Sequence, residues 1–461
     1  MSNAGSVVVV GGGMGGLSAA WNLRRLSPGV QVRVLEARAA PGGPVRSERV
    51  DGFLVDHGPN GLLMNRLETA EALAALGLED ELVAASPKSN TRYLFDEGRM
   101  CPFPSGFVSL LRWPVLSLGA KLRLLCEPFV PRARREHAES FHAFVSRRLG
   151  HEVGDRLAQV LLAGVSGGDA RRVDAAVFFR MHGWERDHGS ILVGALRARA
   201  RWRRQTAHLP PVLRSGRLTS FRDGMGTLSD ALVRSLGDCV QVGTKVDAVA
   251  RRGAQWALRS TTGEEVVADA LVLALAPAAA APLLAEAAPQ VAALLRQQAR
   301  VGLESWTVGY RGDPAGERAA GFGCLCSPKE AQRLGINGIV FTSSIFPGHA
   351  PPGHTVLRVL AGGALQPERL EETREQGEER VLRALRDTLG IAEQPVVMSR
   401  SLWPDMIPAY SVGHVAWRAA LIEALGTCEG LEVAGLGYQG VGVHDVWLSG
   451  AQAAGRLLDA G

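Results

Sequence analysis

Lysine is nearly absent from this 461-residue chain, because only four of its 51 basic residues are lysines. Those four are Lys88, Lys121, Lys245 and Lys329. The other basic residues are arginines, which we interpret as the product of a GC-rich genome. With a net charge of only +5, a surface for phosphate or anionic lipid would need local clusters of arginine. Chemistry that depends on a lysine has few candidates here.

Cysteine is sparse and follows no pattern. The six cysteines show no repeated spacing, and Cys324 and Cys326 form the only close pair. A structural zinc site needs a second pair of Cys or His ligands, so we predict no bound metal. We expect six free thiols in a reducing compartment.

Long apolar runs and a targeting segment are also missing. The sequence enters an apolar strand at Val7, with no basic leader or cleavage site before it. No uncharged apolar segment reaches about 18 residues, the length that a membrane-spanning helix needs. These absences predict a cytoplasmic protein that does not span a membrane.

Glycine, by contrast, is abundant at 55 residues, and the length predicts two or three domains. Strand–turn–helix or strand-rich blocks at 7–36, 240–276 and 431–458 alternate with a helical stretch and a β-rich stretch. We therefore predict an α/β fold in which a Rossmann-type domain is interleaved with a β-rich domain and a helical lobe. The expected ranges are 1–85, 213–299 and 405–461 for the first, 86–104 and 300–404 for the second, and 105–212 for the lobe.

The turn after the first strand carries the spacing G-x-G-x-x-G, as Gly11, Gly13 and Gly16. In a dinucleotide site the first glycine permits the tight turn, the second admits the pyrophosphate, and the third lets the helix pack on the strand. The phosphates then lie at a helix N-terminus, where free N–H groups point outward. Glu36 ends the second strand, near the spacing of acids that bind ribose hydroxyls. This context makes a chance glycine-rich turn a poor alternative.

The residues that follow Glu36 separate FAD from NAD. Two glycines and an arginine (42–46) and the segment 58–60 resemble the pattern shared by amine oxidases, phytoene desaturases and protoporphyrinogen oxidases. The resemblance extends to the segments around 246 and 435–443, and it implies FAD bound without a covalent link. The residues that it implies for cofactor binding are Gly11, Gly13, Met14, Gly15, Gly16, Glu36, Ala37, Arg38, Gly42, Gly43, Arg46, Gly58, Pro59, Asn60, Val246, Gly435, Gly442 and Val443.

The segment I-P-A-Y-S-V-G-H at 407–414 resembles the I-P-x-Y-x-x-G-H signature of protoporphyrinogen oxidases. The resemblance, which runs nearly end to end, implies oxidation of protoporphyrinogen IX to protoporphyrin IX in haem biosynthesis. FAD would accept the hydride, and O2 would reoxidise it and leave as H2O2. Coproporphyrinogen III, the substrate of one bacterial branch, is an alternative that the sequence leaves open.

Departures from the family pattern keep other functions open. His444-Asp445-Val446 stands where the family has Asn-Asp-Cys, and the loop 163–169 lacks the usual aromatic residue. A related amine oxidase or desaturase with another substrate is one alternative, although none of the four lysines lies in a flavin-facing motif. A flavin-stabilised binding protein without catalysis is another.

The resemblance also implies four substrate-binding residues. Arg92 would bind a carboxylate, and the backbone at Gly164 would crowd the substrate. Val340 and Leu360, in two adjacent predicted strands (339–342 and 356–360), would form apolar walls. Without the resemblance, Arg92 is equally an ordinary surface arginine, and the two apolar residues are ordinary core. We assign no catalytic residue, because the flavin carries the chemistry. We interpret His444 as a helix-start residue and not as a base.

The helical stretch combines apolar and basic residues. The segment 107–116, with Trp113 and Leu116, is expected to form an exposed apolar turn near basic residues, and a second basic run (197–204) surrounds Trp202. This composition suits peripheral docking on an anionic membrane, and the alternative is a lobe with a solvated arginine face. We expect no nucleic-acid partner, because no binding motif accompanies the charge. A homodimer stays open.

Overall fold

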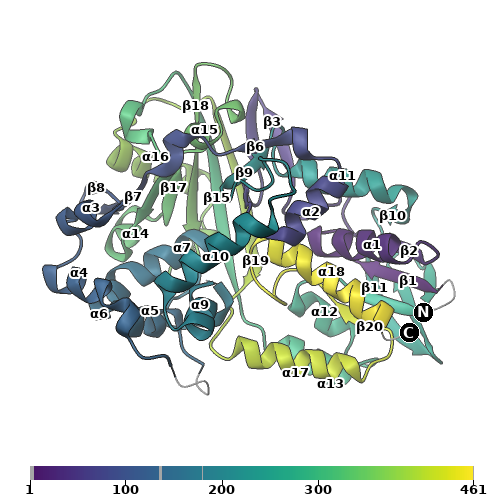
Figure 1. Cartoon of the computed structure of the whole chain (residues 1–461). Coiled ribbons are helices and arrows are strands. Elements are labelled where there is room, and N and C mark those ends of the chain that lie inside the picture. The colour runs from purple at the N-terminus through teal and green to yellow at the C-terminus, as the bar shows by residue number, and fades with distance from the viewer. Residues whose placement is uncertain (1–4, 134–137, 179, 460–461) are drawn as a thin grey trace.

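Two sheets organise the chain, and each is built from segments far apart in the sequence. The computed structural model describes residues 5–133, 138–178 and 180–459. In Figure 1 the larger sheet stands at the upper left, a lobe of helices lies beneath it, and the smaller sheet with its helices lies at the right.

The smaller sheet is parallel and has the order β10-β2-β1-β14-β20. Its strands are β1 (Ser6–Val10), β2 (Gln31–Leu35), β10 (Val240–Gln241), β14 (Ala270–Leu273) and β20 (Leu431–Val433). Side chains alternate across a strand, so Val7 and Val9 enter one apolar cluster while Val8 and Val10 enter another. This sheet is therefore buried on both faces, as a parallel sheet requires.

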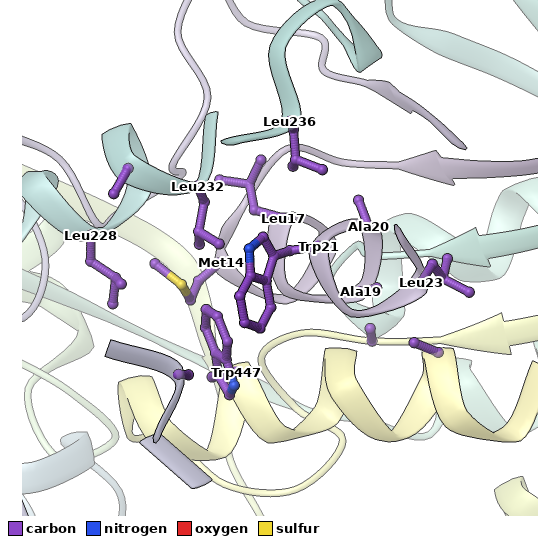
Figure 2. Packing of buried hydrophobic residues seen from close by; sticks show 14 of the residues in the cluster. Met14, Leu17, Ala19, Ala20, Trp21, Leu23, Leu228, Leu232, Leu236 and Trp447 are labelled. Atoms are coloured by element: carbon purple, nitrogen blue, oxygen red, sulfur yellow. The ribbon is translucent and has the colours of Figure 1, made fainter. Parts of the chain in front are cut away.

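Helices cover one of these faces. They are α1 (Met14–Leu26), α2 (Leu67–Ala75), α11 (Gly226–Leu236) and α18 (Val443–Asp459). Figure 2 shows Trp21 of α1 and Trp447 of α18 facing one another, with ring centroids 5.5 Å apart. The N-terminal and C-terminal parts of the chain thus share one core.

The opposite face is covered by three helices and an antiparallel meander. These are α12 (Pro277–Leu283), α13 (Pro289–Arg296), α17 (His414–Gly426), β11 (Val246–Arg252), β12 (Gln255–Ser260) and β13 (Glu265–Ala268). Two smaller sheets complete this half. They are the hairpin of β3 (Ser47–Val50) and β4 (Phe53–Asp56), and the sheet of β5 (Leu62–Leu63), β9 (Leu218–Phe221) and β6 (Leu82–Ala84).

The larger sheet has seven strands in the order β19-β15-β18-β17-β16-β7-β8. They are β7 (Arg92–Asp96), β8 (Arg99–Pro102), β15 (Arg300–Arg311), β16 (Gly323–Cys326), β17 (Gly338–Val340), β18 (His354–Gly362) and β19 (Val397–Pro408). One face of this sheet shares an apolar core with α14 (Pro328–Leu334) and α16 (Arg374–Leu389). The short helix α15 (Thr342–Ile345) lies beside β18. The other face meets the helical lobe and carries the predicted substrate residues.

The helical lobe lies between β8 and β9. It contains α3 (Phe107–Arg112), α4 (Leu118–Leu125), α5 (Phe141–Leu149), α6 (His151–Val153), α7 (Gln159–Ser166), α8 (Ala175–Phe178), α9 (Arg180–His188) and α10 (Ile191–Gln205), with a π-helical turn at Gly154–Ala158. In the part of the chain that the structure describes, no helix combines the length and apolar character needed to cross a bilayer.

One expectation for this lobe is wrong. Trp113 and Leu116, which the sequence suggested as exposed apolar residues, are only 4% and 3% exposed. They belong to the core that joins the lobe to the large sheet, where Trp113 lies against Phe103.

Candidate active site

The turn between β1 and α1 requires glycine at two places and leaves room at a third. A Cβ on Gly11 would stand 2.5 Å from the carbonyl oxygen of Ala274, and a Cβ on Gly16 would stand 1.9 Å from that of Gly11. At Gly13, by contrast, a Cβ would meet nothing within 4 Å. This open space at the start of a helix is where a pyrophosphate would approach the backbone. The residues present therefore fit a dinucleotide.

The beginning of α1 and the segment that leads to α18 are pressed together. A Cβ on Gly15 would lie 2.6 Å from the Cα of Gly435, and a Cβ on Gly450 would lie 2.2 Å from the carbonyl oxygen of Gly15. Ser449 fixes the approach, since its Oγ accepts a hydrogen bond from the N–H of Gly435 at 2.8 Å. Only small residues allow two backbones to come this close.

Glu36 organises one end of the site. Its two carboxylate oxygens accept hydrogen bonds from the N–H groups of Gly12 (2.7 Å) and Arg38 (2.8 Å). The segment that leads into Val246 runs alongside, because the N–H of Thr244 donates to the carbonyl oxygen of Glu36. Val246 itself is buried, whereas Ala37 and Arg38 are exposed. The structure thus brings together the residues predicted for the adenosine end, with Glu36 also holding the glycine turn.

The other predicted cofactor segments meet beside the same turn. Gly42 donates its N–H to the carbonyl oxygen of Gly12, and Gly43 lies opposite Gly13. Arg46 folds back, with its Nε donating to the carbonyl oxygen of Gly43 at 2.9 Å. These contacts fix the loop that would flank the diphosphate.

The segment 58–60 packs directly on this loop. A Cβ on Gly58, the residue before Pro59, would lie 2.4 Å from the carbonyl oxygen of Pro44, so the two backbone segments are in contact. The side-chain Nδ2 of Asn60 is buried without a hydrogen-bond partner. A buried amide normally finds an acceptor, and a bound cofactor would supply one here.

The start of α18 carries a tight group of charges. Gly442 donates its N–H to Oδ2 of Asp445, just before the helix begins at Val443. Burial raises the pKa of Asp445, while Arg66 and Arg180 oppose the shift. The pKa of His444 is lowered to about 3, mainly by burial and further by those same two arginines. His444 is therefore neutral near pH 7 and a poor base, and its Nδ1 is paired with the hydroxyl of Thr69.

The four predicted substrate residues lie on one face of the seven-stranded sheet and on the helix opposite. Register places Arg92 and Val340 on either side of Gly323 in one cross-strand row. Leu360 lies in the next row, opposite Gly338. Leu325 belongs to this second row, although the sequence did not single it out. Its side chain links the sheet to α7, because a Cβ on Gly164 would stand 2.8 Å from Cδ2 of Leu325.

Arg92 projects at the edge of this apolar wall. Its guanidinium lies over the ring of Phe322, 4.5 Å from the centroid. Phe322 and Val340 in turn pack against the same small apolar cluster. Burial lowers the pKa of Arg92, which still remains charged. Within the described ranges no carboxylate lies in ion-pair distance of it, so the guanidinium is free to bind an acidic ligand.

The signature segment 407–414 connects the large sheet to the helical lobe. Tyr410 is fully buried and adopts a positive φ of 46°, and its carbonyl oxygen accepts from the N–H of Asp174. The carboxylate of Asp174 accepts from the N–H of Gly413 at 3.0 Å. His414 stacks between Tyr410 and Trp417, with both centroid distances at 4.9 Å. The segment thereby connects β19 and α17 to the helical lobe, and the contact of Asp174 was not predicted from the sequence.

A cavity of about 520 Å³ lies beside the segment 407–414. Residues from the segments 168–173, 299–302, 363–371 and 404–411 line it. The lining includes acidic and basic side chains. None of the predicted substrate or cofactor residues lines it. An apolar disc with acidic edges fits the surface around Leu325 better than this charged cavity.

Comparisons with known proteins agree with this geometry. The family described as flavin containing amine oxidoreductase matches residues 14–458. Coproporphyrinogen III oxidase of Propionibacterium freudenreichii is 30% identical over 98% of this chain and 91% of its own length. Protoporphyrinogen oxidase of Homo sapiens is 31% identical over 98% of both chains.

Solved structures share the fold. A crystal structure from Exiguobacterium sp. 255-15 has a TM-score of 0.82 at 24% identity and covers 99% of both chains. Putrescine oxidase has a TM-score of 0.71 at 16% identity over the same share of each chain. The predicted α/β architecture, with a Rossmann-type unit interleaved with a β-rich unit and a helical lobe, is confirmed.

Proposed function

Since this chain belongs to the flavin containing amine oxidoreductase family, among its protoporphyrinogen oxidases, we propose that it oxidises a porphyrinogen in haem biosynthesis. The protein is an FAD-dependent oxidoreductase. Protoporphyrinogen IX is the substrate that we propose, with O2 as the final oxidant and H2O2 as its product.

The observation that carries the proposal is the pairing of Arg92 with an apolar wall. A porphyrinogen is a large apolar macrocycle with carboxylates on its rim. Leu325, Leu360 and Val340 offer apolar contact on one sheet face, and Arg92 offers an unpaired guanidinium at its edge. Arginine binds a carboxylate through two parallel hydrogen bonds, so it would fix the orientation of the ring.

The chain's own residues would act by binding and exclusion. Bound FAD supplies the acceptor for hydride equivalents. The glycine turn and the start of α1 would hold the diphosphate, and Glu36 would hold the ribose end. Gly164, packed against Leu325, keeps the substrate space narrow, and the lobe covers the sheet face against water. His444 is too weak a base to take a proton near neutral pH.

Anaerobic mixing with each porphyrinogen tests this function. Bleaching of the oxidised flavin spectrum by protoporphyrinogen IX, followed by recovery on admission of O2, is the expected result. Faster bleaching by coproporphyrinogen III would select that alternative, which the relative from P. freudenreichii favours. No bleaching by either compound would contradict the proposal.

The lobe presents an apolar surface that we propose as a peripheral membrane contact. Among the described residues its large exposed apolar side chains include Phe107, Val108, Leu111, Leu118, Leu122, Leu125, Phe129, Leu192 and Leu196. Arg112 and Arg197 lie among them in the sequence, which suits anionic headgroups. A homodimer would cover the same kind of surface. The cytoplasmic location stays a prediction.

We also propose that the chain divides at the predicted boundaries. The five-stranded sheet draws all its strands from 1–85, 213–299 and 405–461, and β7, β8, β15, β16, β17 and β18 come from 86–104 and 300–404. Strand β19 crosses the boundary at 404, since it continues to Pro408. The lobe helices lie within 105–212.

A further inference from the structure

Arg358, in the middle of β18, is a buried cation without a carboxylate partner in the described part of the chain. Only 8% of its surface is exposed. Its Nη2 donates to Oγ of Ser305 at 2.9 Å, and its Nε is buried without a partner. The sequence showed no reason to select this residue.

Two other buried arginines behave differently. Arg148 pairs with Glu127, and Arg380 pairs with Glu304 and Glu372. Each of these charges is neutralised where it is buried. The contrast matters because an uncompensated charge in the interior is strongly destabilising, and a guanidinium cannot shed its proton to avoid this. A chain that keeps such a residue is expected to meet an anion there.

The acid that most influences Arg358 does not serve as that anion. Asp56, at the end of β4, raises the pKa of Arg358 against the effect of burial. Its Oδ1 is already engaged, because it accepts from the hydroxyl of Ser47 (2.5 Å) and from the N–H of Met225 (3.0 Å). No ion pair within 4.0 Å joins Asp56 to Arg358.

The position of Arg358 points to the cofactor. Its partner Ser305 is opposite Leu360 on one side and Ser401 on the other. Oγ of Ser401 lies 3.0 Å from Nδ1 of His57, and the carbonyl oxygen of His57 accepts from Nε1 of Trp403. His57 leads directly into the cofactor segment 58–60. The sheet face around Arg358 is thus in contact with that segment on one side and continues into the substrate wall on the other.

We propose that Arg358 is a positioning residue that places a fixed positive charge beside the flavin and stabilises its reduced, anionic form. A hydride carries two electrons and one proton, so the ring that accepts it gains one negative charge. In a buried site this charge interacts strongly with a nearby guanidinium. The inference depends on the cofactor site described above and is independent of which porphyrinogen the enzyme oxidises.

The midpoint potential of bound FAD tests the proposal without any porphyrinogen. We expect a more negative potential in Arg358→Met, a value close to wild type in Arg358→Lys, and a smaller negative shift in Ser305→Ala. Sulfite adds to the flavin ring and places a negative charge on it. Its affinity for Arg358→Met should therefore fall about tenfold or more, as expected for the loss of one buried charge contact.

Two controls separate this role from a structural one. Arg259→Met removes an exposed arginine on β12 and should change neither quantity. If Arg358→Met does not retain FAD, the same comparison is made between Arg358→Lys and Arg358→Gln. An unchanged potential and sulfite affinity in an FAD-loaded variant that lacks the charge would overturn the proposal. Weaker porphyrinogen binding at an unchanged potential would also overturn it, by assigning Arg358 to a substrate carboxylate.

Discussion

A methyl group on Gly15 would stand 2.6 Å from the Cα of Gly435, although 419 residues of chain separate the two glycines. The close approach sets the start of α1 beside the segment that leads into α18. Both helix N-termini can then act on one bound molecule, because each carries a partial positive charge.

Gly13→Val should abolish retention of FAD while the protein still folds. Gly13 has an extended backbone (φ −75°, ψ 177°), which valine adopts readily, and the added side chain meets no protein atom within 4 Å at its Cβ. It would occupy the space that the pyrophosphate needs. Flavin absorbance per mole of purified protein is the measurement, and Gly29→Val, also in open space but at a distant turn, is the control. Full flavin occupancy in Gly13→Val would show that the site is misplaced.

Arg92→Ala should raise KM for a porphyrinogen with little change in flavin content. The guanidinium has Phe322 beneath it and no acidic partner among the described residues, so its loss removes a ligand contact and breaks no ion pair. Arg92 is exposed in the absence of a ligand, and a charge-assisted contact that a bound substrate buries is worth about 2–5 kcal/mol. Arg99→Ala, on the neighbouring strand of the same hairpin, should behave like wild type. Equal KM values for wild type and Arg92→Ala would remove Arg92 from the site.

Leu118→Asp with Phe129→Asp should weaken binding to anionic liposomes even at low salt. These side chains are 64% and 86% exposed, so the changes remove apolar contact with lipid and leave the core intact. Wild-type binding should fall at high salt, because ions screen the arginines within about a Debye length. Leu26→Asp is the control, since Leu26 is an exposed apolar residue at the far end of α1. If the wild type ignores such liposomes, the surface is either solvated or an interface between copies, which sedimentation would separate.

The folded state should lose stability as pH falls from about 6.5 towards 4. Burial lowers the pKa of His414 to about 4, so the unfolded chain takes up a proton on this residue before the folded chain does. The contribution of His414 to the free energy of unfolding is fully present above pH 6.5. A pKa difference of this size between the unfolded and the folded chain corresponds to about 3 kcal/mol of that free energy lost by pH 4. His444 has its pKa lowered to about 3 and adds to the same trend.

Urea unfolding at pH 7 and pH 4.5, with FAD in excess, measures this loss. His414→Phe should reduce the difference between the two pH values, while His151→Phe, at an exposed position, should not. An identical pH dependence in His414→Phe and wild type would contradict the assignment.

The parts of the fold that sequence predicted well are those where one local pattern has a single structural solution. The strand, turn and helix around Gly11 and Gly16 are examples, because spacing and sterics both demand glycine there. Val340 and Leu360 were also expected on adjacent strands, and β17 and β18 do pair. Their roles in binding substrate stay predictions.

Sequence failed where exposure depends on distant partners. Trp113 follows an amphipathic stretch that would look the same on a membrane-facing turn, yet Phe103 and the large sheet bury it. Arg358 reads as an ordinary strand residue until its hydrogen bond to Ser305 of the neighbouring strand is seen, and Asp174 gives no hint of holding Gly413. In each case the information lies in the pairing of segments, which no local window contains.

Strand β20 and helix α18 have a consequence for biosynthesis. A ribosome makes β1 and α1 long before residues 431–459, which complete the sheet and the helix pair that frame the glycine turn. Until residue 447 has been made, the apolar flank of α1 around Trp21 lacks its partner Trp447. The cofactor can be captured tightly only once α18 has been made, so FAD supply should govern how much of the chain matures and how much is lost to proteolysis.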